Sequence, residues 1–325
     1  MSPPRVRHEL VPVAAADGRA LRVERSWREE VDRARAPAVI VCHGFVQNCR
    51  SFESPRRSLL ARLRDAGAVV WTVELRGRDG ARPAEGLHDY ADLDAPAVIV
   101  AARAAHPQLA WLGHSMGGLV GALTPAAAAL DALVTLGSPL LPGPPRLHGL
   151  GRRLIGPARA AHRRGLPFAG RRWGQTLWHL RLGLGSDRVP APVRLWAPGE
   201  LDEEALRVLL RGSFADDSHA VFADLLELVA SDGERAGRVD VSARLATLRV
   251  PLLAVAGGRD DLAPPAGVRP LFERTASPER HWLELGPATA SVALGHIDLV
   301  VGDSAPALVW QPALAFLRRH LKGLR

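Results

Sequence analysis

The fold is decided by one stretch of the chain, Gly113-His114-Ser115-Met116-Gly117-Gly118. The apolar residues 109–112 before it are typical of a buried strand, and the small residues 119–130 after it are typical of a helix. Gly-x-Ser-x-Gly between a strand and a helix predicts a sharp turn, the nucleophile elbow, in which the glycines leave room for the nearly colliding elements. Ser115 is therefore a candidate nucleophile, and the amide of Met116 is a candidate oxyanion donor.

A second strand with its following loop is expected to reach the elbow. The continuous apolar residues 38–42 predict a strand that is buried on both faces. His43-Gly44-Phe45 follows at once, and its glycine lets the loop approach the elbow. The Phe45 amide is then a second candidate oxyanion donor, with Gln47 and Asn48 expected to brace the loop. The alternative is that His43-Gly44 only ends a strand.

The order of strands and helices predicts an α/β fold with a mostly parallel central sheet flanked by helices. Apolar strand patterns alternate with helical patterns before Ser115, as in right-handed βαβ units. A hairpin around Asp17-Gly18 is expected at one edge of the sheet. Later strands are expected at 133–137, 251–257 and 281–285. Helices are expected at residues 55–66, 89–105, 119–130, 202–211, 218–231 and 306–321.

The pattern of parallel strands is interrupted once. Residues 139–245 contain prolines, an arginine-rich stretch and helical patterns, but no apolar run typical of a parallel strand. The sequence therefore predicts an α/β core formed by residues 1–138 and 246–325. Residues 139–245 are predicted to form a helical cap inserted over the site.

A serine hydroxyl needs a base, and a histidine base works better when a carboxylate orients it. Downstream of Ser115, His296 lies in a glycine-flanked loop after the last expected strand. Asp260 and Asp261 both follow the strand before it, and Asp298 lies two residues beyond His296. Asp260 is preferred as the acid and Asp261 is the fallback. Asp298 is expected to brace the histidine loop.

With these motifs, the chain resembles the α/β-hydrolase superfamily over nearly its whole length. The motifs that carry the resemblance are His43-Gly44-Phe45, the elbow, Gly257-x-x-Asp260-x-x-x-Pro264 and Gly295-His296. The resemblance implies a triad of Ser115 as nucleophile, Asp260 as acid and His296 as base. It further implies an oxyanion hole formed by the amides of Phe45 and Met116.

The resemblance also implies an activity. Residues 245–260 and 295–302 look like lipases and polyhydroxyalkanoate synthases, but those synthases carry cysteine where this chain has Ser115. Serine favours hydrolysis of a carboxylic (acyl) ester through an acyl-enzyme intermediate, with no metal or cofactor. One alternative is an acyltransferase of the polyhydroxyalkanoate-synthase-like type. Another is a non-catalytic module that binds a lipid surface.

The positive charge is concentrated in the predicted cap. The net charge is +8 and Lys322 is the only lysine, but residues 146–188 hold ten arginines and one acid. Leucine, phenylalanine and tryptophan are interleaved with these arginines, so the cap could meet anionic lipid or an anionic acyl substrate. A solvated face of an arginine-rich chain is the alternative. Nucleic acid is not an expected partner, because no recognised binding module is present.

The remaining bulk features indicate a cytoplasmic globular protein. The hydrophobic fraction of 47% is ordinary for a chain with a sizeable core. No run of 18 apolar residues occurs, and the start of the chain lacks an apolar signal core. The only cysteines, Cys42 and Cys49, are too few for a disulfide framework and are expected to be reduced thiols.

Overall fold

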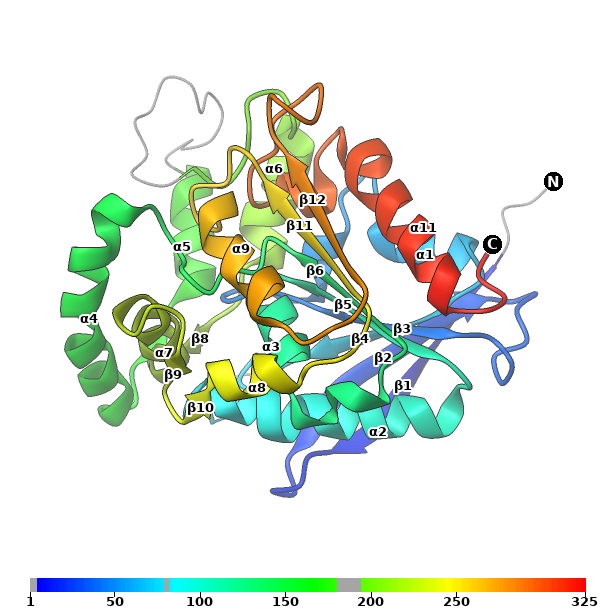
Figure 1. The fold of residues 1–325 in the computed structure, drawn as a ribbon, viewed down its shortest axis with the longest axis horizontal. Helices are drawn as coiled ribbons and strands as arrows, with labels where there is room; N and C mark the ends of the chain where they lie inside the picture. Colours follow the sequence, from blue (N-terminus) through cyan, green and yellow to red (C-terminus); the bar gives the residue numbers. More distant parts are fainter. Residues whose placement is uncertain (1–4, 79–81, 180–193) are drawn as a thin grey trace.

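The computed structural model describes residues 5–78, 82–179 and 194–325, and in them an eight-stranded sheet lies between two layers of helices (Figure 1). The first strand pairs antiparallel with the second, and the second pairs antiparallel with β4. The pairs from β4 onward are parallel, so the predicted α/β class with a mostly parallel sheet is confirmed. In spatial order the strands are β1 (Val6–Ala14), β2 (Ala20–Arg28), β4 (Val69–Glu74), β3 (Ala38–Cys42), β5 (Leu109–His114), β6 (Ala132–Leu136), β11 (Leu252–Gly257) and β12 (Arg280–Leu285).

The sheet is buried on both faces, which explains the continuous apolar runs in its central strands. Side chains alternate across a strand, so Ile40 of β3 joins one hydrophobic cluster and Val41 joins the other. The first cluster includes residues of α2 (Ala95–Ala105), α3 (Met116–Leu123) and α8 (Val241–Thr247). The second includes residues of α1 (Leu59–Asp65), α10 (Asp298–Val301) and α11 (Gln311–His320).

Several predicted helices begin or end elsewhere for local reasons. The helix predicted at 55–66 begins only at Leu59, where the Ser58 hydroxyl accepts the Ala61 amide at 2.9 Å as an N-cap. The helix predicted at 119–130 ends at Leu123, because Pro125 cannot continue it; a 3₁₀ turn follows. The helices predicted at 89–105 and 306–321 each open with a π-helical turn, Asp89–Asp94 and Pro306–Trp310.

In the described part of residues 139–245, the regular structure is mostly helical. The strands found there are two residues long, and the predicted helices at 202–211 and 218–231 correspond to α6 and α7. Part of the predicted cap, residues 180–193, lies outside the described residues, and α8 crosses its predicted end at residue 245. The division into core and cap stays a prediction. The helices of this region are α4 (Pro145–Arg163), α5 (Gly170–His179), α6 (Glu203–Val208) and α7 (His219–Ala230).

None of the helices in the described ranges is both long enough and apolar enough to cross a lipid bilayer.

Candidate active site

Ser115 lies in a strained turn between β5 and α3. Its backbone has φ 54° and ψ −125°, a conformation that residues with a side chain rarely adopt. The glycines around it permit this turn, because a Cβ on Gly117 would lie 2.3 Å from the carbonyl oxygen of Cys42. A Cβ on Gly113 would lie equally close, 2.3 Å, to the amide nitrogen of Gly118. The close approach expected at the elbow is therefore present.

The structure brings His296 and Asp260 together. His296 Nδ1 lies 2.7 Å from Asp260 Oδ2, and both residues are buried. The other oxygen, Asp260 Oδ1, accepts the amides of Leu262 and Ala263 at 2.9 and 2.6 Å, which fixes the carboxylate. Asp261 is instead half-buried, and its Oδ2 accepts the amide of Arg194 at 3.0 Å. Of the two candidate acids, the one beside the histidine is thus Asp260.

Two buried side chains hold the loop that carries His296. The His114 ring lies against the His296 ring, with centroids 4.5 Å apart, and its Nε2 is 3.1 Å from the His296 carbonyl oxygen. Burial holds the pKa of His114 well below its ordinary value, so its ring is neutral. Asp298 Oδ2 accepts the amides of Gly295 and Ala197 at 2.7 and 2.6 Å, as expected of a residue that braces the loop.

The groups that would meet a substrate are left without internal partners. Among the described residues, the Ser115 hydroxyl makes no hydrogen bond and the Phe45 amide has no acceptor. Met116 is the first residue of α3, and the first amides of a helix lack an acceptor within it. One hydroxyl and two amides at the carboxyl ends of β3 and β5 are therefore available to a ligand.

The loop that carries Phe45 is held in a strained conformation from both ends. The Gly44 amide donates to Gln47 Oε1 at 3.1 Å, and Asn48 Nδ2 donates to the carbonyl of Gly212 at 3.0 Å. Val46 has φ 52°, which is unfavourable for a β-branched residue. Its amide donates to Asp217 Oδ2 at 2.9 Å. The bracing expected of Gln47 and Asn48 is observed.

Asp217 is a site residue that the sequence reasoning missed. Its buried carboxylate accepts the Val46 amide and the Arg78 guanidinium on Oδ2, the latter at 2.6 Å, and the Tyr90 hydroxyl at 2.9 Å on Oδ1. Asp217 precedes α7, where an acid is an ordinary helix-start residue. Its local sequence therefore holds no signal for this role.

Aromatic side chains line the outer side of the oxyanion loop. The Phe45 ring contacts those of Phe168 and Phe222, with centroids 5.1 and 5.9 Å apart, and these two rings lie 4.9 Å from each other. Phe168 and Phe222 both come from residues 139–245. An apolar cluster thus joins this region to the loop beside Ser115.

Comparisons with known proteins agree with the fold. The family described as alpha/beta hydrolase fold matches residues 37–177, which hold the elbow and the Phe45 loop. The chain therefore has the α/β-hydrolase fold, as the motifs in its sequence predict.

Solved structures with this fold cover nearly the whole chain. A complex of DcsB with a substrate analogue has a TM-score of 0.63 at 16% identity, over 97% of this chain and 100% of that one. A thermophilic esterase from Thermogutta terrifontis has a TM-score of 0.62 at 18% identity, over 97% and 99%. A monoacylglycerol lipase from Paleococcus ferrophilus has a TM-score of 0.57 at 15% identity, over 92% and 99%. No curated protein sequence matches the chain.

Proposed function

We propose that this protein is a carboxylester hydrolase that works through an acyl-enzyme on Ser115, with His296 as base and Asp260 as acid. One observation carries the proposal, namely a buried His296–Asp260 pair whose histidine ring packs against that of His114, the residue before Ser115 in the strained elbow. The esterase and the lipase with the same fold support ester hydrolysis as the reaction.

The His296–Asp260 contact would set the protonation of the base. A carboxylate 2.7 Å from Nδ1 favours the tautomer with the proton on that nitrogen. Nε2 is then unprotonated and can take the proton of the Ser115 hydroxyl as its oxygen attacks the ester carbonyl. The imidazolium that forms is stabilised by Asp260 and returns its proton to the leaving alcohol.

The amides of Phe45 and Met116 would stabilise the oxyanion. An amide aimed at the developing charge contributes roughly 3 kcal/mol in comparable sites. After the alcohol leaves, water loses a proton to His296 and attacks the acyl-enzyme, which releases the acid and restores Ser115.

The acyl group is expected to be apolar, because Phe45, Phe168 and Phe222 cluster at the oxyanion loop. Hydrolysis of p-nitrophenyl esters of increasing chain length tests this expectation. Higher kcat/KM for medium and long acyl chains than for acetate supports an apolar acyl site. Equal kcat/KM values across the series contradict an apolar acyl site.

Labelling with a fluorophosphonate tests the enzyme itself. Wild-type protein should be labelled at Ser115, and Ser115→Ala should be neither labelled nor active. Folded wild-type protein without labelling would identify a non-catalytic module. An added acceptor alcohol separates hydrolysis from acyl transfer: a predominant new ester product would assign the acyltransferase reaction.

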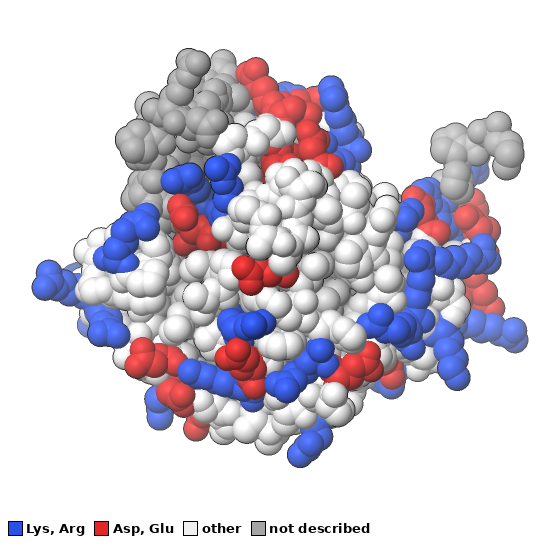
Figure 2. Space-filling model, turned by 45° about the horizontal axis from the view of Figure 1, so that its top comes forward, with Lys and Arg blue, Asp and Glu red and all other residues white. Residues whose placement is uncertain are grey.

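We further propose that the arginine-rich region contacts anionic lipid. Leu150, Leu154 and Trp173 expose 55%, 38% and 56% of their surface, and arginine pairs such as Arg152 and Arg153 adjoin them. Figure 2 shows basic side chains with uncharged surface between them at the left edge, where α4 lies in Figure 1. Arginines beside exposed apolar groups suit an anionic bilayer surface. Co-sedimentation with anionic but not neutral vesicles, weakened in Trp173→Ala, is the expected result.

We expect the protein in the cytoplasm, a proposal that rests on its cysteines. Cys42 is buried and Cys49 half-buried, and both are free thiols. A reducing compartment keeps such thiols free. Cell fractionation checks the location.

A further inference from the structure

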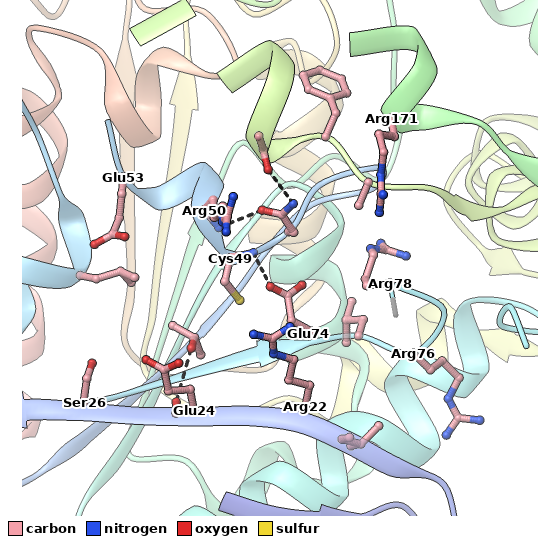
Figure 3. A pocket seen from close by; sticks show the side chains of 18 of the residues that line it. Arg22, Glu24, Ser26, Cys49, Arg50, Glu53, Glu74, Arg76, Arg78 and Arg171 are labelled. Carbon is pink, nitrogen blue, oxygen red and sulfur yellow. Dashed lines mark hydrogen bonds between the residues drawn. The ribbon is translucent and has the colours of Figure 1, made fainter. Parts of the chain in front are cut away.

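A hollow of about 710 Å³ lies apart from the proposed catalytic residues (Figure 3). Its walls are one face of β2 and β4, the turn after the oxyanion loop, and residues of α5 and of the segment before α7. Neither Ser115 nor Phe45, Asp260 or His296 lines it. Sites for small molecules typically measure about 300–1000 Å³, so the hollow has the size of a binding site that the ester-cleaving reaction does not use.

The described lining of the hollow is strongly basic. It contains eight arginines and three glutamates. Each glutamate already has a partner: Glu24 meets His8 at 2.7 Å, Glu53 accepts the Ser58 hydroxyl at 2.7 Å, and Glu74 accepts the Cys49 amide at 3.0 Å. The acids of the lining are therefore not paired with its arginines, apart from a long contact of 3.9 Å between Glu53 and Arg64.

Apart from Arg19, which is half-buried and has a partner of its own, the arginines fall into two groups. The more buried ones are fixed within the fold: Arg64 donates to Ser26, Arg76 is paired with Asp17 and Asp94, and Arg78 is paired with Asp217. Four others are exposed, and their guanidinium groups have no hydrogen bond or ion pair within the described residues. These four are Arg22, Arg50, Arg171 and Arg211.

The unpaired arginines come from separate elements that meet at this hollow. Figure 3 shows Arg22 on β2, Arg50 in the turn after the oxyanion loop and Arg171 on α5, on different sides of the space between them. Arg50 also lies close to the segment that carries Arg211, because a Cβ on Gly212 would lie 4.0 Å from Arg50 Nη1. Segments up to 189 residues apart, from Arg22 to Arg211, thus supply cations to one concave surface.

We propose that this hollow binds a phosphate-bearing anion at a site separate from the ester-cleaving one. A guanidinium keeps its charge at physiological pH, and its planar fork matches two oxygens of a phosphate group. Several unpaired guanidinium groups around one hollow repel each other, and an anion placed among them removes that repulsion. A ligand with two phosphate groups could engage Arg50 and Arg171 together. The phosphate could belong to a soluble ester or to a lipid headgroup.

Isothermal titration calorimetry on the whole protein tests the proposal with two probes, inorganic pyrophosphate and monomeric short-chain phosphatidic acid. The test variant is Arg50→Gln/Arg171→Gln. Its matched control is Arg249→Gln, because Arg249 is also exposed but lies outside the arginine-rich residues 146–188 and does not line the hollow. Equal melting temperatures of the variants show that each is folded.

We expect saturable binding of at least one probe to wild-type protein. Each lost charge-assisted contact should raise Kd about tenfold, so the double variant should bind about a hundredfold more weakly. Arg249→Gln should bind as wild type does. Pyrophosphate binding identifies a soluble phosphate ligand, and binding of phosphatidic acid alone identifies a lipid headgroup. Absence of binding of both probes to wild type, or equal weakening by Arg249→Gln, overturns the proposal.

Discussion

Asp217 Oδ2 lies 2.9 Å from the amide nitrogen of Val46, so a carboxylate just before α7 holds the loop that presents the Phe45 amide. Val46 keeps its positive φ only while its surroundings hold it there. Arg78 and Tyr90 hold Asp217 in turn. The loop that carries Phe45 is thus tied to the segment just before α7.

Asp217→Asn should lower kcat by about tenfold to a hundredfold with little change in KM, because a misplaced Phe45 amide weakens binding of the transition state but not of the substrate. It should also reduce the free energy of unfolding by about 3 kcal/mol, since buried Arg78 loses its counter-charge. Steady-state kinetics and denaturant unfolding measure the two effects. Asp216→Asn is the control, because within the described residues the hydrogen bond of the Asp216 side chain is with the Arg171 amide alone. An unchanged kcat in Asp217→Asn would show that the loop keeps its shape without the carboxylate.

Asp260→Asn should lower kcat by about 10⁴-fold, because an amide at this position favours the wrong tautomer of His296. Asp261→Asn should change kcat less than about threefold, since Asp261 binds only the backbone of Arg194 among the hydrogen bonds of the described residues. Kinetics on one p-nitrophenyl ester compares them. A larger loss in Asp261→Asn would make Asp261 the acid.

Gly137→Ala should impair both stability and activity. Gly137 has φ 56°, and an added Cβ would lie 3.2 Å from Asp260 Oδ2 and from His296 Nδ1. We expect a loss of about 1 kcal/mol in stability from the backbone strain, and a drop in kcat from displacement of the acid–base pair. Gly18→Ala separates the two effects, because Gly18 has φ 80° with no atom within 4 Å of an added Cβ. Gly18→Ala should lose stability and keep kcat. If Gly137→Ala also keeps its kcat, the Asp260–His296 pair tolerates the added methyl group.

The contribution of Asp298 to stability should fall as pH rises, opposite in sign to that of His114, whose pKa is lowered by burial. Burial raises the pKa of Asp298 to about 7, with Glu200 and Asp260 nearby adding to the rise and the amides of Ala197 and Gly295 opposing it. The folded protein then holds a proton between about pH 4 and 7 that the unfolded chain releases, so this contribution to stability falls with rising pH in that window, by at most about 1.4 kcal/mol per pH unit. Asp298→Asn should remove this slope in unfolding curves measured from pH 4 to 8. Parallel curves for the two proteins would contradict the assignment.

Much of the sheet and of the proposed site could be predicted from the sequence because those signals are local. The strand at 38–42 is buried on both faces, so it appears as an unbroken apolar run. The elbow needs two glycines within five residues, and Asp260 and His296 each follow a strand within a short motif.

The missed residue Asp217 depends on contacts between distant residues, whereas the misplaced helix ends depend on local capping and proline. Asp217 meets Val46 and Arg78, which lie 171 and 139 residues away, and nothing in its own neighbourhood indicates either partner. The helix starts at Leu59 and the helix end at Leu123 were set by capping and by proline, which shift boundaries by a few residues.

The Asp217–Val46 contact links the segment before α7 thermodynamically to the loop that carries Phe45. If the ordered segment at Asp217 strengthens binding in the oxyanion hole by some free energy, then binding in the hole must stabilise that segment by the same free energy. A covalent tetrahedral adduct on Ser115 should therefore slow amide hydrogen exchange at residues 213–218. The exchange rates of residues 213–218, which contact no substrate atom, would then show whether the oxyanion hole is occupied.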